Sequence, residues 1–115
     1  MDNNTLLIEG AKSALRPILK QLPKGWTEIH LLYILYGTED GLIINITAPT
    51  DYAKPDISVQ SEEIQKKLRT LQKNMTALND FWRQLIISYR SSDGKLEVGT
   101  NNIYGETAQD VLTQL

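Results

Sequence analysis

The chain has 115 residues, of which 41% are apolar, and this is enough material for one domain, residues 1–115, with a buried core. Twelve basic and 14 acidic residues give a net charge of −2, which argues against general nucleic-acid binding because that needs a concentrated basic surface. There is no cysteine, so disulfides, thiolate metal sites and cysteine nucleophiles are excluded.

No export or membrane signal is visible in the sequence. The first ten residues, MDNNTLLIEG, lack the basic region and the long apolar stretch of a signal peptide. No run approaches the roughly 18 to 20 apolar residues that span a bilayer. We therefore expect a cytoplasmic protein.

A helix is expected near the start of the chain. Asn4 or Thr5 is suited to cap it. Six apolar residues follow at helical spacing: Leu7, Ala11, Ala14, Leu15, Ile18 and Leu22. Pro17 lies inside this pattern and predicts a kink or a break, because proline removes one backbone hydrogen bond and disfavours helix at the preceding residue.

The most continuously apolar stretch, residues 26–48, predicts the hairpin around which the core forms. Residues 27–36 and 41–47 read as strands, and residues 37–41 form an acidic turn whose Gly and Asp tolerate positive φ. Alternation places Ile29, Leu31, Tyr33 and Leu35 on one face of the first strand and His30, Leu32, Ile34 and Tyr36 on the other. Both faces are largely apolar, which indicates cover on both sides or an interface on one of them.

The next segment is expected to pass from a loop into an amphipathic helix. Residues 48–59 contain two prolines and read as a loop, with a weak signal for a short strand at 57–59. Ser61 is expected to cap the helix that follows. Its apolar side is spaced by four and three residues: Ile64, Leu68, Leu71, Met75 and Leu78.

The rest of the chain predicts a second hairpin and a last helix. Residues 83–90 alternate as a strand, the Asp93-Gly94 pair suits a tight turn, and Leu96 and Val98 mark a shorter strand. Thr107 is suited to cap a final helix. The order helix, strand, strand, helix, strand, strand, helix predicts an α+β fold, with an antiparallel sheet of about four strands and helices packed mainly on one face.

The sequence shows no arrangement typical of catalysis. It contains no P-loop, no G-x-G-x-x-G and no triad order, so we expect no enzyme and no cofactor. His30, the only histidine, lies within a predicted strand without metal-ligand spacing, and we interpret it as a structural or surface residue. Trp26 and Trp82 each stand at the entry to a strand and are expected to seal the ends of the core.

Five residues in predicted turns and loops are candidates for partner binding: Glu39, Asp40, Asp51, Tyr52 and Asp56. The four acids form one patch, complementary to a basic partner, if the first turn and the long loop lie at the same end of the sheet. Solvated turns are the more ordinary explanation of such acids. Tyr52, in a proline-rich loop, fits a binding anchor and an ordinary loop residue equally well.

Three segments of the chain match a pattern found in one family. They are LPKGWTEIHL at 22–31, an L-x-x-L-x-x-x-M helix at 68–75, and WRQLIISYRSSDGKLEV at 82–98. The combination resembles the YezG-like immunity proteins of bacterial polymorphic and contact-dependent toxin systems. That family pairs a Pro-x-x-Trp entry into the first strand with a later Trp-strand-Asp-Gly-Lys hairpin, and the resemblance covers roughly residues 15–104.

The resemblance implies a small cytoplasmic protein, monomer or homodimer, that binds a cognate toxin domain and occludes its active site or an adjoining surface. A nuclease is the expected target, because a basic cleft attracts carboxylates. Neither nucleic acid nor a membrane is expected as a partner. The alternative is a dimeric type III secretion-like chaperone that holds an effector segment in apolar grooves, which the doubly apolar strand at 27–36 would suit.

Overall fold

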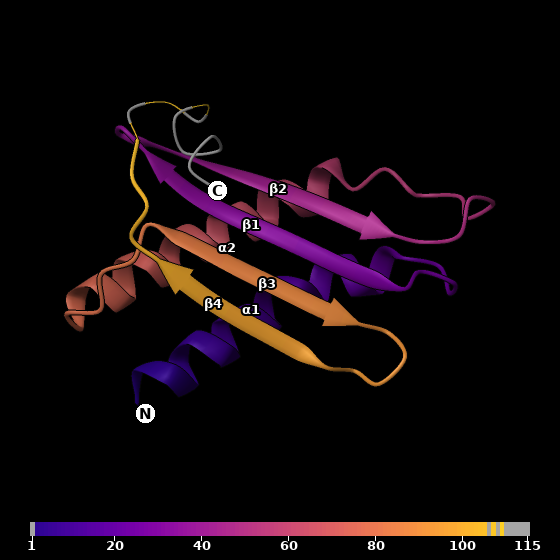
Figure 1. The fold of residues 1–115 in the computed structure, drawn as a ribbon, viewed down its shortest axis with the longest axis horizontal. Coiled ribbons are helices and arrows are strands. Elements are labelled where there is room, and N and C mark those ends of the chain that lie inside the picture. Colours follow the sequence, from indigo (N-terminus) through magenta and orange to yellow (C-terminus); the bar gives the residue numbers. More distant parts are fainter. Residues whose placement is uncertain (1, 106, 108, 110–115) are drawn as a thin grey trace.

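The computed structural model describes residues 2–105, 107 and 109, and its two helices cover one face of a four-stranded antiparallel sheet (Figure 1). The elements are α1 (Asn3–Gln21), β1 (Glu28–Tyr36), β2 (Glu39–Thr47), α2 (Ser58–Ala77), β3 (Gln84–Arg90) and β4 (Leu96–Asn101). This confirms the α+β prediction and the order of its first six elements. The helix expected after Thr107 falls on residues outside the described part of the chain.

The sheet has the strand order β2-β1-β3-β4, so β1 joins the two hairpins. Leu31 lies opposite Ile44 of β2 and Ile87 of β3, and all three side chains point toward the helices. β1 is thus an inner strand, and its odd-numbered side chains face the helices while its even-numbered ones face away from them. Even on the face away from the helices, Ile34 is only 2% exposed.

α1 differs from the expected helix at its start and at its proline. Asp2 is the cap, because its Oδ1 accepts a 2.7 Å hydrogen bond from the Thr5 amide. The helix runs through Pro17 without a break. Proline has no N–H for the Ser13 carbonyl four residues earlier, and the Lys67 ammonium of α2 donates to that carbonyl instead, at 3.1 Å. The tertiary contact thus supplies the hydrogen bond that the proline removes.

The β1–β2 turn is tighter than the sequence suggested. It consists of Gly37 and Thr38, with Gly37 at a φ of 55°. Glu39 pairs with Tyr36, so Glu39 and Asp40 belong to β2 and not to the turn. The alternating position of Asp40 points its side chain toward the helix layer, beside α2.

α2 begins before the expected cap at Ser61, and no strand forms at residues 57–59. The Asp56 carboxylate accepts hydrogen bonds from the amide and the hydroxyl of Ser58, at 2.9 and 2.6 Å, and so holds the first turn. The expected apolar side is buried except at its last member. Leu78 follows the helix and is half exposed, because Asn79 takes a positive φ of 63° and turns the chain away.

Aromatic side chains close the two ends of the core, as expected. Trp82 is 3% exposed and donates its Nε1–H to the Met75 sulfur at 3.3 Å. Its ring meets Tyr33 edge-on, with the ring centroids 6.3 Å apart. Trp26 is partly buried and packs against Tyr89 at 5.9 Å. Across the described residues, no helix combines the length and the apolar character needed to cross a bilayer.

Candidate functional site

The five residues predicted to bind a partner lie in two groups at opposite ends of β2. Glu39 and Asp40 begin the strand, whereas Asp51, Tyr52 and Asp56 belong to the loop that follows its end. A strand of nine residues, at about 3.3 Å per residue, separates the groups by roughly 25 Å. The first turn and the long loop therefore do not lie at the same end of the sheet, and the four acids do not form one patch.

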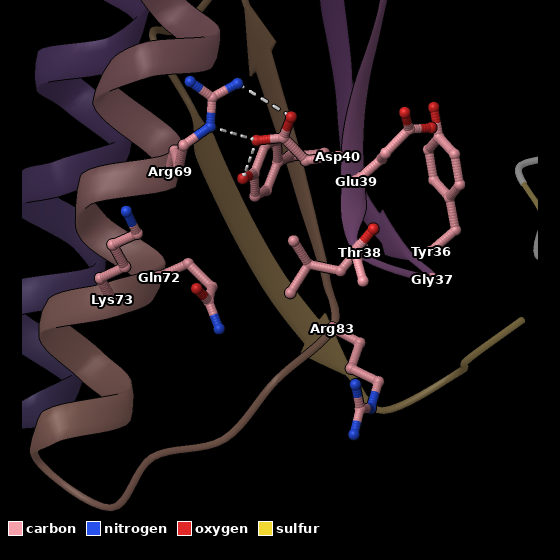
Figure 2. A pocket seen from close by; sticks show the side chains of 11 residues that line it. Tyr36, Gly37, Thr38, Glu39, Asp40, Arg69, Gln72, Lys73 and Arg83 are labelled. Carbon is pink, nitrogen blue, oxygen red and sulfur yellow. Dashed lines mark hydrogen bonds and ion pairs between the residues drawn. The ribbon is translucent and has the colours of Figure 1, made fainter. Parts of the chain in front are cut away.

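Asp40 is held within the protein by four side-chain hydrogen bonds. Arg69 donates from Nε and Nη2 to the two carboxylate oxygens, at 2.8 and 2.9 Å. The Tyr33 hydroxyl donates at 2.6 Å and the Gln65 amide at 3.0 Å. Figure 2 shows the bonds between Arg69 and Asp40. These donors, Arg69 above all, lower the pKa of the Asp40 carboxyl to about 2. Burial and the neighbouring carboxylate raise the pKa of the Tyr33 hydroxyl above its ordinary value.

Beside this network lies a hollow of about 660 Å³ between the β1–β2 turn and α2, which we call the turn-end hollow (Figure 2). Its wall includes Glu39 of β2, Lys73 of α2 and Arg83, which precedes β3. Arg83 stacks its guanidinium over the Tyr104 ring, 4.6 Å from the centroid. None of these three charges forms an ion pair within the described residues. The hollow therefore presents both signs of charge and suits polar contacts.

The loop group is mainly structural. The Tyr52 hydroxyl donates to the Pro23 carbonyl at 2.7 Å, and its ring lies so close to Gly25 that a Cβ there would sit 3.2 Å from it. Gly25 itself has a φ of 119°, which favours glycine. Because the Asp56 carboxylate accepts hydrogen bonds from Ser58, only Asp51 of this group is exposed without an interaction among the described residues. No local pattern in the sequence predicts that Tyr52 holds the loop against the α1–β1 turn.

The face of the sheet that turns away from the helices, here called the open face, exposes an apolar row. Leu32 of β1 lies opposite Ile43 of β2 on one side and Ile86 of β3 on the other. Ile43 is 37% exposed and Ile86 is 42% exposed. The three side chains line one shallow depression together with His30 and Asn45. The apolar character of both faces of β1 was the sequence signal for this surface.

His30 lies on the open face between a carboxylate and a hydroxyl, an arrangement with the composition of a catalytic triad. Its Nε2 is 2.8 Å from Glu28 Oε2, and its Nδ1 is 3.2 Å from Ser88 Oγ. Acyl transfer also needs free N–H groups to stabilise an oxyanion. β1 and β3 are inner strands whose amides are directed at neighbouring strands, so none is offered beside Ser88. We interpret the three residues as polar cross-strand neighbours.

Neither a metal site among the described residues nor a match to a known family identifies the function of this protein. Within residues 2–105, 107 and 109, no group of three or more His, Asp or Glu side chains is placed to hold a metal ion. No family model and no curated protein matches the chain.

Proposed function

We propose that this chain is an immunity protein, an antitoxin that binds one cognate bacterial toxin domain in the cytoplasm and occludes its active site or an adjoining surface. The observation that supports this most directly is the open face. Its apolar row of Leu32, Ile43 and Ile86 spans three hydrogen-bonded strands and is only partly covered. Exposed apolar surface that runs across several elements is typical of protein-binding sites.

The surroundings of the apolar row resemble the anatomy of a protein interface, in which an apolar centre is bordered by polar groups. Beside the row on the open face, His30 of β1 and Ser88 of β3 form a hydrogen bond with each other. Toward β4, the Lys95 ammonium and the Glu97 carboxylate form an ion pair at 3.0 Å. These groups are exposed and can exchange water for partner contacts at modest cost.

The structural positions of the segments that resemble YezG-like proteins also support the proposal. The 22–31 segment forms the turn into β1, where Trp26 packs on Tyr89. The 82–98 segment forms the β3–β4 hairpin, entered by the buried Trp82. A chain that uses both segments to build its core has the framework expected of that family. A nuclease target in a contact-dependent growth inhibition system stays a prediction from the resemblance, because the acids of this chain are dispersed.

The test begins with capture of the toxin and ends with a purified pair. The chain, tagged at its C-terminus, is expressed in its native host, and co-purifying proteins are identified by mass spectrometry. The partner domain is then produced alone, and calorimetry should show a folded complex with one toxin domain per chain. Adding the chain should abolish the toxin's activity. A partner that binds only through an unfolded segment and keeps its activity would instead indicate the secretion-chaperone alternative.

A matched pair of variants locates the interface. Ile86→Lys places a charge in the apolar row of the open face, and we expect the toxin affinity to fall at least about tenfold, since central interface residues typically carry such energies. Val59→Lys makes the same change at a 74% exposed residue of α2, in the helix layer behind the sheet, and should leave the affinity unchanged. Equal affinities for the two variants would show that the toxin binds elsewhere.

A further inference from the structure

β2 is an edge strand, and half of its backbone hydrogen-bonding groups face away from the sheet. The two-residue turn makes Tyr36 and Glu39 a hydrogen-bonded pair, and such pairs then recur at every second residue. The hydrogen bond from the Leu35 amide to the Arg83 carbonyl is consistent with this alternation, because it shows that the odd-numbered residues of β1 direct their backbone groups toward β3 and not toward β2. The even-numbered residues of β2 therefore direct their N–H and C=O groups outward. They are Asp40, Leu42, Ile44 and Ile46.

Within the part of the chain that the structure describes, this edge has little of the protection that sheet edges usually carry, apart from the inward-pointing charge of Asp40. Within the described residues, only the Gln65 amide reaches an outward group, the Asp40 carbonyl, at a long 3.4 Å. β2 contains no lysine, no proline and no bulge, and its residues 41–47 are uncharged. The opposite edge, β4, is shorter, and the Lys95–Glu97 ion pair lies at its start. A long edge that is uncharged over most of its length is a template for pairing with another strand.

The sequence of β2 is suited to pair with a second copy of itself. Ile43 is the midpoint of the nine-residue strand. An antiparallel two-fold arrangement centred there sets Leu42 opposite Ile44 of the second copy, and Asp40 opposite Ile46 of that copy. All four residues have outward-directed groups, so each such pair exchanges two hydrogen bonds. The register that the symmetry dictates is therefore also the register that satisfies the edge.

We propose that the protein forms a homodimer in which the β2 edges of two copies pair antiparallel about Ile43, joining two four-stranded sheets into one. At the two-fold axis, the Ile43 side chains of the two copies meet on the open face, with Cα atoms about 4.5 Å apart. The apolar row of each copy, Ile86, Leu32 and Ile43, then continues into that of the other. The open face stays uncovered, so the dimer does not depend on the proposed immunity function and does not block it.

Cysteine cross-linking tests both the contact and its register, because the natural chain has no cysteine. In the proposed dimer, the Cα separation at Ile43→Cys falls within the range that a disulfide spans. Mild oxidation should therefore convert this variant to a covalent dimer. Asn45→Cys is the control, since it lies on the same strand and face. The pairing separates the two copies of residue 45 by four residues, about 13 Å, so the Asn45→Cys variant should not form a disulfide-linked dimer. Equal cross-linking of both variants would overturn the proposed register.

Sedimentation equilibrium tests the dimer without cross-linking. The natural chain should sediment at twice the mass of one chain. Ile43→Lys opposes two ammonium groups across the axis and should give the monomer. Ile86→Lys makes the same change on the same face of the inner strand β3 and should leave the dimer intact. A natural chain that is monomeric at every concentration, or Lys variants that dissociate equally, would refute the proposal. Toxin binding is measured separately, so failure of either proposal is recognised on its own.

Discussion

Replacing Asp40 with asparagine tests whether the network beside the turn-end hollow stabilises the fold. The substitution keeps the shape of the side chain but removes the charge that Arg69 and Tyr33 both contact. The carboxylate is only 12% exposed, so solvent screens these contacts weakly. We expect Asp40→Asn to lower the free energy of unfolding at neutral pH.

The pKa of Asp40 sets the size of the effect. A fall from the ordinary value of 3.8 to about 2 corresponds to about 2 kcal/mol of stability. The loss of stability in Asp40→Asn should stay near 2 kcal/mol, about the value from the pKa, and below the loss expected for a fully buried ion pair. The reason is that the Arg69 side chain is 45% exposed and is solvated by water when its partner charge is removed. Because the folded-state pKa is lowered, this stability is fully present above about pH 4 and is lost as the pH falls through about 2.

Urea unfolding followed by tryptophan fluorescence provides the assay, at neutral pH and again near pH 2. At neutral pH the midpoint of Asp40→Asn should fall by about 1 to 2 M, and the difference from the natural chain should shrink near pH 2. Asp93→Asn is the matched control: Arg90 holds Asp93 in the same two-bond geometry and also lowers its pKa to about 2, but the Asp93 side chain is 49% exposed, against 12% for Asp40, so solvent screening should make the loss of stability smaller. Equal losses for both variants, or a difference that persists near pH 2, would refute the reasoning.

Three other expectations concern helix packing, the proline in α1 and the exposed acid of the loop. Gly10→Val should lower stability by about 1 to 3 kcal/mol in thermal unfolding, because a Cβ at Gly10 already comes within 2.6 Å of the Leu71 side chain. Lys67→Met should lower the free energy of unfolding by about 1 kcal/mol in the natural chain. The loss should be smaller in a chain that also carries Pro17→Ala, because the restored N–H replaces the Lys67 contact, and a double-mutant cycle measures this difference. Asp51→Lys should slow association with the proposed toxin partner and weaken the salt dependence of the association rate in stopped-flow mixing.

Each of these expectations has a result that would contradict it. Gly99→Val is the control for helix packing, because nothing lies within 4 Å of a Cβ at that position; a similar loss there would exclude the Leu71 contact as the cause. If Lys67→Met lowers the free energy of unfolding equally in the natural chain and in the Pro17→Ala variant, the Lys67 ammonium does not replace the missing N–H. An unchanged association rate for Asp51→Lys would remove that acid from the interface.

The element order was predictable because each helix and strand has its own apolar period. The buried side of α2 follows from Ile64, Leu68, Leu71 and Met75 alone. Its start did not follow, because Ser61 is suited to cap a helix, whereas α2 already begins at Ser58, whose amide and hydroxyl donate to the Asp56 carboxylate. The tight turn at Gly37 was misjudged for a similar reason: five residues of turn type stood in a row, and pairing with Tyr36 decides which of them belong to the strand.

The candidate site was predictable only where local geometry decides it. Glu39 and Asp51 flank a single strand, so the alternation of turns and strands already implies that they lie at opposite ends of it. The Asp40–Arg69 contact joins residues 29 positions apart and depends on how α2 crosses the sheet, which no local pattern reveals. The exposed row at Ile43 and Ile86 has the same origin, since strand order determines which apolar faces the helices reach.

The place of β1 between β2 and β3 has a consequence for the order of folding events. The β1–β2 and β3–β4 hairpins each close short loops, so their chain-entropy cost is small and they can form early. The seam between β1 and β3, where Leu31 meets Ile87, closes the long segment that contains α2. We therefore expect destabilising changes along this seam and in the two turns to slow folding, because the hairpins are already formed when the seam closes.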